Sequence, residues 1–75
     1  MSIPSIVASV LGIAESEVSG RTGPATEGGW TSLRHLEIIT TVQREYAIRL
    51  TPREIRSVRS VAALQELIDE RTAAL

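Results

Sequence analysis

The chain contains no cysteine, a single histidine and, among its eight basic residues, no lysine. Without cysteine it forms no disulfide framework, no thiolate zinc site and no cysteine nucleophile. One histidine cannot build a metal site from imidazole ligands, so we expect no bound metal. No apolar run approaches the length that spans a bilayer, which predicts no membrane partner. The formal net charge is only −1 at pH 7, which argues against bulk electrostatic binding to nucleic acid.

The length of 75 residues predicts one small domain, residues 1–75, with too little core to enclose a deep substrate cavity. The apolar N-terminal stretch raises the question of a signal peptide. It carries no Lys or Arg ahead of its apolar part, and Pro4 interrupts it, so we expect none. These observations together predict a cytoplasmic protein that acts as a monomer.

The first helix is predicted from apolar residues that recur with helical spacing, namely Ile3, Ile6, Val7, Val10 and Leu11. Ser2 can cap this helix, Pro4 is tolerated in its first turn, and Gly12 can end it. Residues 14–29 hold four of the five glycines, and we expect a long ordered loop there, with Val18 returning to the core. A loop of this length in a small domain is usually functional.

The second helix is predicted over residues 32–46, and it carries two apolar stripes instead of one. The core stripe consists of Ile38, Ile39, Val42 and Tyr46. The other stripe lies on the same side as Ser32 and consists of Leu33, Leu36 and Thr40. Because a helix in a small bundle needs only one buried face, we expect the second stripe to be a docking surface for a partner.

Two further helices complete an all-α chain without strands or internal repeats. Thr51-Pro52-Arg53-Glu54 is a capping box with proline at the first helical position, which predicts a short helix from Pro52 to Ser57. Ile55 and Val58 should turn inward. A last helix, capped by Ser60, is predicted over residues 61 to about 71, with its core residues at Val61, Leu64, Leu67 and Ile68.

Ser32 opens the second helix, within Gly28-Gly29-Trp30-Thr31-Ser32-Leu33. A hydroxyl at a helix N-terminus lies where unpaired backbone N–H groups and the helix dipole favour a phosphate. This position suits a serine that becomes esterified. It suits a plain capping serine equally well, so the residues alone leave both roles open.

The order of these elements resembles the acyl carrier protein family, including its peptidyl carrier relatives, over nearly the whole chain. The resembling stretches are Gly12-Ile13-Ala14-Glu15-Ser16-Glu17-Val18, Ser32-Leu33, Glu45-Tyr46-Ala47-Ile48, Leu50-Thr51-Pro52-Arg53-Glu54-Ile55 and Ser57-Val58-Arg59-Ser60-Val61. The resemblance implies a four-helix bundle with a short third helix and a long loop between the first two helices. It implies that Ser32 carries 4′-phosphopantetheine, whose thiol holds acyl or aminoacyl groups as thioesters. The implied partners are a phosphopantetheinyl transferase and the enzymes that load, modify and unload the arm.

Two departures from the family pattern concern the modification and the partners. Thr31 stands where the family has an aspartate before the serine, so it can cap the helix but supplies no carboxylate to the transferase. Where family members are acidic, the second and third helices here carry Arg34, Arg44, Arg53 and Arg56. A dedicated pathway, such as polyketide or related natural-product assembly, therefore fits better than fatty acid synthesis. We expect docking through the second stripe, with Arg34 and Glu37 at its rim and the arginines facing the partner.

Three further features of the sequence each allow more than one interpretation of their role. His35 follows Ser32 by three residues, but a Ser–His hydrolase would lack an orienting acid, so we expect a half-buried or partner-facing histidine. The basic run from Arg49 to Arg59 is broken by Thr51-Pro52, which favours partner docking over nucleic-acid binding. Trp30 is expected to be a core plug that pins the loop to the second helix.

The glycine-rich loop follows no strand and contains no Gly-Lys-Ser/Thr, so it does not indicate nucleotide binding. The sequence thus predicts a carrier and not an enzyme. The alternative is a carrier-like adaptor that is never modified and only binds a partner protein.

Overall fold

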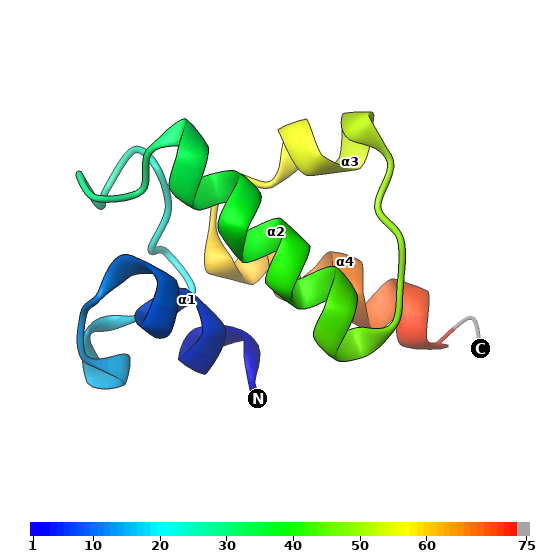
Figure 1. Ribbon diagram of the computed structural model, residues 1–75, viewed down its shortest axis with the longest axis horizontal. Coiled ribbons are helices and arrows are strands. Elements are labelled where there is room, and N and C mark those ends of the chain that lie inside the picture. Colours follow the sequence, from blue (N-terminus) through cyan, green and yellow to red (C-terminus); the bar gives the residue numbers. More distant parts are fainter. Residues whose placement is uncertain (74–75) are drawn as a thin grey trace.

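Four α-helices and one short 3-10 helix make up the fold in the computed structural model, which describes residues 1–73 (Figure 1). No strand occurs in that range. The long helix α2 crosses the molecule diagonally, and the short helix α3 lies along the upper edge in Figure 1. In chain order the elements are α1 (Ile3–Leu11), the 3-10 helix η1 (Glu15–Glu17), α2 (Ser32–Tyr46), α3 (Pro52–Ser57) and α4 (Val61–Ala73). The expected all-α, acyl-carrier-like bundle with a short third helix is confirmed.

The first helix begins and ends where local chemistry places it. The Ser2 side chain accepts a hydrogen bond from the Ser5 N–H at 3.2 Å, which satisfies one of the unpaired donors of the first turn. Gly12 ends α1 with a φ of 70°, a left-handed conformation that a residue with a Cβ rarely adopts. The predictions for both ends of this helix are confirmed.

The core lies between α1, α2 and α4 and contains the predicted apolar stripes. The fully buried side chains of α2 are those of Ile38, Ile39 and Val42, as expected. Tyr46 is only half-buried, because its hydroxyl reaches the surface and donates to the Met1 carbonyl at 3.0 Å. The remaining large residues of the core cluster are Ile3, Ile6, Val7, Trp30, Leu50, Val58, Val61, Leu64 and Ile68.

Two details differ from the sequence-based expectation. The loop from residue 14 to residue 29 is not irregular throughout, because η1 forms one helical turn within it. Its three residues are all polar and exposed, so no apolar periodicity marked them. In addition, α4 continues to Ala73, two residues past the expected end at Arg71. Val18 does pack against the core, as predicted.

The loop is anchored to the start of α4 through its backbone. The Thr22 carbonyl accepts from the Val61 N–H at 2.8 Å, and the Gly20 carbonyl accepts from the Ala62 N–H at 2.9 Å. Ser60 adds a side-chain cap, its hydroxyl accepting from the Ala63 N–H at 3.1 Å. Three donors of the first turn, which α4 itself cannot satisfy, are thereby paired. The loop that delivers the chain to Ser32 is consequently fastened to the start of α4.

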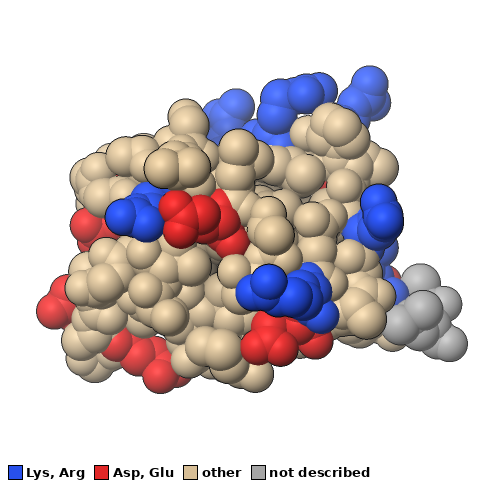
Figure 2. Space-filling model, in the orientation of Figure 1, with Lys and Arg blue, Asp and Glu red and all other residues tan. Residues whose placement is uncertain are grey.

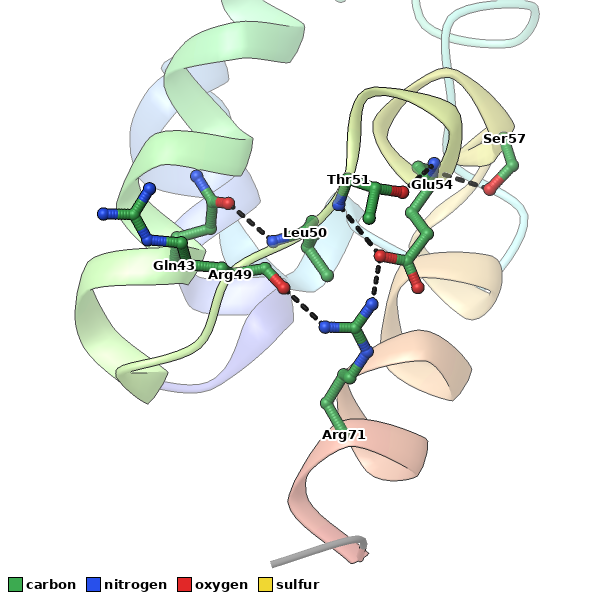
Figure 3. A network of polar contacts seen from close by, with 7 residues as sticks. All are labelled: Gln43, Arg49, Leu50, Thr51, Glu54, Ser57 and Arg71. Carbon is green, nitrogen blue, oxygen red and sulfur yellow. Dashed lines mark hydrogen bonds and ion pairs between the residues drawn. The ribbon is translucent and has the colours of Figure 1, made fainter.

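The start of α3 is held by a polar network that Figure 3 shows from close by. Thr51 and Glu54 form the predicted capping box, with the Thr51 hydroxyl accepting from the Glu54 N–H and the Glu54 carboxylate accepting from the Thr51 N–H. Arg71 of α4 donates to the same carboxylate and to the Arg49 carbonyl. Since α3 contains no fully buried residue, these polar contacts add to the packing of Ile55 against the core in attaching the helix.

Glu54 gives the fold an acid-sensitive contact. The backbone hydrogen bond from Thr51, followed by the hydrogen bond from Arg71, holds the pKa of the Glu54 carboxyl below its ordinary value of about 4.5. A carboxyl group whose pKa is lowered by folding stabilises the native state at pH values above its ordinary pKa. This stabilisation is lost as the pH falls through the pKa of the folded state. We therefore expect the melting temperature of the wild type to fall more steeply in that range than that of Glu54→Gln.

Thermal unfolding followed by circular dichroism over a pH series tests this expectation. Glu66→Gln is the matched control, since it removes an exposed carboxylate from α4 without touching the network. The control should keep the wild-type pH profile. Equal profiles for wild type and Glu54→Gln would contradict a stabilising role of the ionised carboxylate.

Candidate functional site

Ser32 is the first residue of α2, and its side chain is exposed. The cap of this helix is Thr31, whose hydroxyl accepts from the Arg34 N–H at 3.3 Å. The sequence left open whether Ser32 itself caps the helix, and the structure assigns that role to its neighbour. The Ser32 hydroxyl is therefore not engaged in capping, and it stands at the positive end of the α2 dipole.

Trp30 fixes the approach of the chain to this helix. Its side chain is only 3% exposed and belongs to the core cluster, so the expected core plug is confirmed. The backbone N–H of Trp30 donates to the Glu27 carbonyl at 3.0 Å, which closes a turn just ahead of the Thr31 cap. A single residue, Thr31, separates Trp30 from Ser32 along the chain, so burial of the indole limits where the serine can lie.

His35 links the start of α2 to α3 through both of its ring nitrogens. The Trp30 Nε1–H donates to His35 Nδ1 at 3.0 Å, so Nδ1 is the acceptor. In the neutral imidazole the other nitrogen then carries the proton, and Nε2 lies 2.9 Å from the Ile55 carbonyl, to which it donates. Neither nitrogen is left to take a proton from Ser32. The half-buried histidine expected from the sequence is confirmed, and the hydrolase interpretation has no general base.

A groove of about 680 Å³ opens beside Ser32, between the loop, α2 and α3. Its apolar lining comes from Pro24, Trp30, Leu36, Ile55 and Val58. Its polar lining comes from Thr31, Ser32, His35, Arg56 and Arg59. The groove is a surface feature and not an enclosed cavity, in line with the small core expected from the length of the chain.

The second stripe of α2 faces outward, as predicted. Leu33 is 66% exposed and Leu36 is 55% exposed, which makes them two of the three large apolar side chains on the described surface. Thr40 continues the stripe and is also exposed. On its far side, Leu36 and Thr40 line a smaller groove of about 320 Å³ together with Val10, Glu37, Thr41 and Arg44. Leu36 therefore stands between two hollows of the surface.

The charges around the stripe are arranged unevenly. Arg34 and Glu37 form an ion pair at 3.1 Å, with both side chains more than 40% exposed, so the pair contributes little to stability. Arg44, Arg53 and Arg56 are exposed as predicted. Figure 2 shows basic side chains along the edge where Figure 1 places α3, and acidic ones toward the lower left, near α1 and η1.

Two contributors to the site were not identified from the sequence. In the sequence, Arg59 stands out only as part of a basic run, and the structure places it in the lining of the groove. The contact of His35 with the Ile55 carbonyl joins residues 20 positions apart, so no local pattern predicts it. The sequence offers one signal for this site, which is the spacing of Trp30 and His35 around the start of a helix. That spacing brings an indole donor near an imidazole.

Two searches of the described part of the chain concern metal ligands and membrane-spanning helices. Among residues 1–73, no group of three or more His, Cys, Asp or Glu side chains is placed to hold a metal ion. Within the same range, no helix combines the length and the apolar character that crossing a bilayer requires.

Comparison with protein families gives one match that covers most of the chain. Residues 3–68 match the family described as "PP-binding: Phosphopantetheine attachment site". The matched range begins with α1, contains the loop, Ser32, α2 and α3, and ends within α4. A search of curated proteins found no match.

Proposed function

This chain belongs to the phosphopantetheine-attachment family, and from that premise we propose that Ser32 is the residue to which the arm is attached. Members of this family carry 4′-phosphopantetheine covalently, and the chain is a carrier protein of that kind. The observation that supports Ser32 is its exposed hydroxyl at the start of α2, left available because Thr31 provides the cap. The fit is also steric, because the open groove beside Ser32 leaves room for an arm.

Attachment requires one displacement at phosphorus, with coenzyme A as the donor and a phosphopantetheinyl transferase as the catalyst. The Ser32 Oγ attacks the β-phosphorus of the coenzyme A pyrophosphate. The new Oγ–P bond forms as the P–O bond to the adenosine bisphosphate leaving group breaks, and the hydroxyl proton passes to a base of the transferase. At the positive end of α2, the added phosphodiester charge is favourably placed. Once bound, the group supplies a thiol that holds acyl or aminoacyl groups as thioesters.

The chain itself contributes a nucleophile and a docking surface. Carrier domains of this family are in general not catalytic. We propose that residues 1–75 form a single, monomeric carrier domain that serves enzymes for loading, modifying and unloading the arm. The basic residues around α2 and α3 support a dedicated pathway, such as polyketide or related natural-product assembly, with its own transferase.

Intact mass spectrometry tests the proposed function. The purified protein is incubated with coenzyme A and a broad-specificity phosphopantetheinyl transferase, and a gain of one phosphopantetheinyl group is expected. Fragmentation should place the group on Ser32. If the protein gains no mass with any of several transferases, the unmodified adaptor is favoured. The observation that supports the adaptor is that position 31 is a threonine and not an aspartate.

We propose that the transferase and the pathway enzymes dock on the exposed stripe. Leu33, Leu36 and Thr40 provide its apolar contact, and Arg34 and Glu37 lie at its rim. Because Arg34 is already paired with Glu37, the unpaired positive charge around the stripe comes mainly from Arg44, Arg53 and Arg56. A partner with acidic groups around an apolar pocket would complement this surface.

Changing Arg44, Arg53 and Arg56 together to Glu, with or without Arg34→Glu, should slow association with the transferase that modifies the chain. At low salt we expect a loss of about tenfold or more, which shrinks as salt rises because exposed charges steer the encounter. Leu36→Ala should instead speed dissociation with little salt dependence, as expected for an apolar anchor. Stopped-flow association at low and high salt measures the first effect, and stopped-flow dissociation under the same conditions measures the second.

The control for the charge reversal is Arg21→Glu, a single substitution of the same kind at an exposed loop position that lines none of the grooves. Its association rate should stay close to that of the wild type. Wild-type rates for the triple variant at low salt would contradict docking through the basic face.

A further inference from the structure

The groove beside Ser32 has cations but no anion in its lining. Arg56 and Arg59 both border it, and no Asp or Glu does. Both arginines are exposed, and the two ion pairs found within residues 1–73 involve Arg34 and Arg71 instead. A guanidinium presents a planar fork of N–H donors that matches the two oxygens of a carboxylate or phosphate. The surface therefore offers two binding groups for which the described residues provide no counter-charge.

The rest of the groove would bind an extended apolar chain. Trp30, Leu36, Ile55 and Val58 form its apolar wall. A charge–charge attraction is stronger beside such a wall than in open water, because the local dielectric is lower. The lining thus combines a strip suited to methylene groups with two cations suited to one negative group.

The two walls are held at a set separation before anything binds. His35 accepts from Trp30 on one wall and donates to the Ile55 carbonyl on the other, at 3.0 Å and 2.9 Å. Both ring nitrogens are used in this way, so His35 is a spacer and not a ligand. A site that is already open loses less conformational freedom when it is filled, which favours binding.

We propose that this groove binds an anionic group of the arm carried on Ser32, with Arg56 and Arg59 as its cationic contacts. This inference rests on the proposed function. Two sources of the anion share the same chemistry: the phosphodiester at the base of the arm, and a carboxylate at the free end of a dicarboxylic acyl group. In the second case the apolar wall takes the methylene groups between thioester and carboxylate, and the groove selects acidic over neutral acyl groups.

The experiment compares four forms of the protein, prepared with a broad-specificity transferase: unmodified, carrying the arm alone, carrying a butyryl arm and carrying a succinyl arm. Intact mass first establishes the modification of each form. The readout is the indole N–H resonance of Trp30, which is unique because the chain has one tryptophan. For the two acyl forms, the rate at which hydroxylamine cleaves the thioester gives a second readout.

An anion held by the arginines should shift the Trp30 resonance, and the shift should shrink with added salt. The double variant Arg56→Gln/Arg59→Gln should reduce the shift, and Arg21→Gln, at an exposed position that lines none of the grooves, should preserve it. If the carboxylate is the anion, hydroxylamine should cleave the succinyl thioester about two- to fivefold more slowly than the butyryl thioester in the wild-type protein. This range is the one expected of an exposed ion pair. The double variant should not show the difference. An arginine-dependent shift already present with the arm alone identifies the phosphodiester.

The results separate this inference from the function on which it rests. If no form gains the expected mass, attachment at Ser32 fails and the inference fails with it. If the mass is gained but the arginine variants match the wild type in every form, attachment stands and the anion site is overturned.

Discussion

Ser32→Ala is expected to abolish attachment of the arm while leaving the fold intact. The hydroxyl is the only group that this substitution removes, and it is exposed and takes no part in capping α2. The free energy of unfolding should therefore change by no more than about 0.5 kcal/mol, as for other surface substitutions. Intact mass after incubation with coenzyme A and transferase measures the first effect, and thermal unfolding measures the second.

Thr31→Ala is the informative companion variant, because it should produce the opposite pattern. It removes the cap that accepts from the Arg34 N–H, which should cost about 0.5–2 kcal/mol of stability. It leaves the Ser32 hydroxyl in place, so the mass gain should persist. Modification of the Ser32→Ala protein would place the attachment site elsewhere, and unfolding of that protein would show that Ser32 is a structural residue.

Gly23→Ala is expected to destabilise the whole fold. A Cβ at this position would lie 2.1 Å from the Arg59 carbonyl oxygen and 3.2 Å from the Ser60 Cα, and both are backbone atoms. No rotation of a side chain can relieve that overlap, so the loop must withdraw from the start of α4. Steric overpacking typically costs about 1–3 kcal/mol. In a domain of this size each kcal/mol lowers the melting temperature by about 4–8 °C.

Gly28→Ala is the matched control, since a Cβ there meets nothing within 4 Å. The two variants make the same chemical change in the same loop and differ only in the space available. Circular dichroism melts of both proteins decide the matter. A melting temperature for Gly23→Ala equal to that of Gly28→Ala would mean that the loop does not pack against Arg59 in solution.

Elements governed by neighbouring residues could be predicted from the sequence. The bounds of α3 were predicted correctly, and its start follows from Thr51, Pro52 and Glu54, which make a cap whose partners lie within one turn. The exposed stripe of α2 was predicted for a similar reason, since helical spacing alone places Leu33 and Leu36 away from Ile38. The start of α2 was predicted as well, but not the choice between Thr31 and Ser32 as its cap, because either hydroxyl could reach an unpaired N–H.

Features that depend on distant residues could not be predicted. The groove lies between α2 and α3, and the contact of His35 with the Ile55 carbonyl bridges these two helices. Arg59 became part of the site by the same packing. The role of Gly23 was equally hidden, since its neighbour in space is Arg59, which lies in another part of the chain. The attachment residue, by contrast, was proposed from its place in a local motif.

The anchoring of the loop by the carbonyls of Gly20 and Thr22 has a consequence for how such a chain can change. Every residue has a carbonyl, so most substitutions in the loop leave both anchors in place. A deletion or insertion between these two positions would misalign the carbonyls with the N–H groups of Val61 and Ala62. The exposed side chain of Arg21, which lies between the two anchors, can therefore be exchanged while the length of the segment is kept. The loop can acquire a new outer surface beside the groove without moving Ser32.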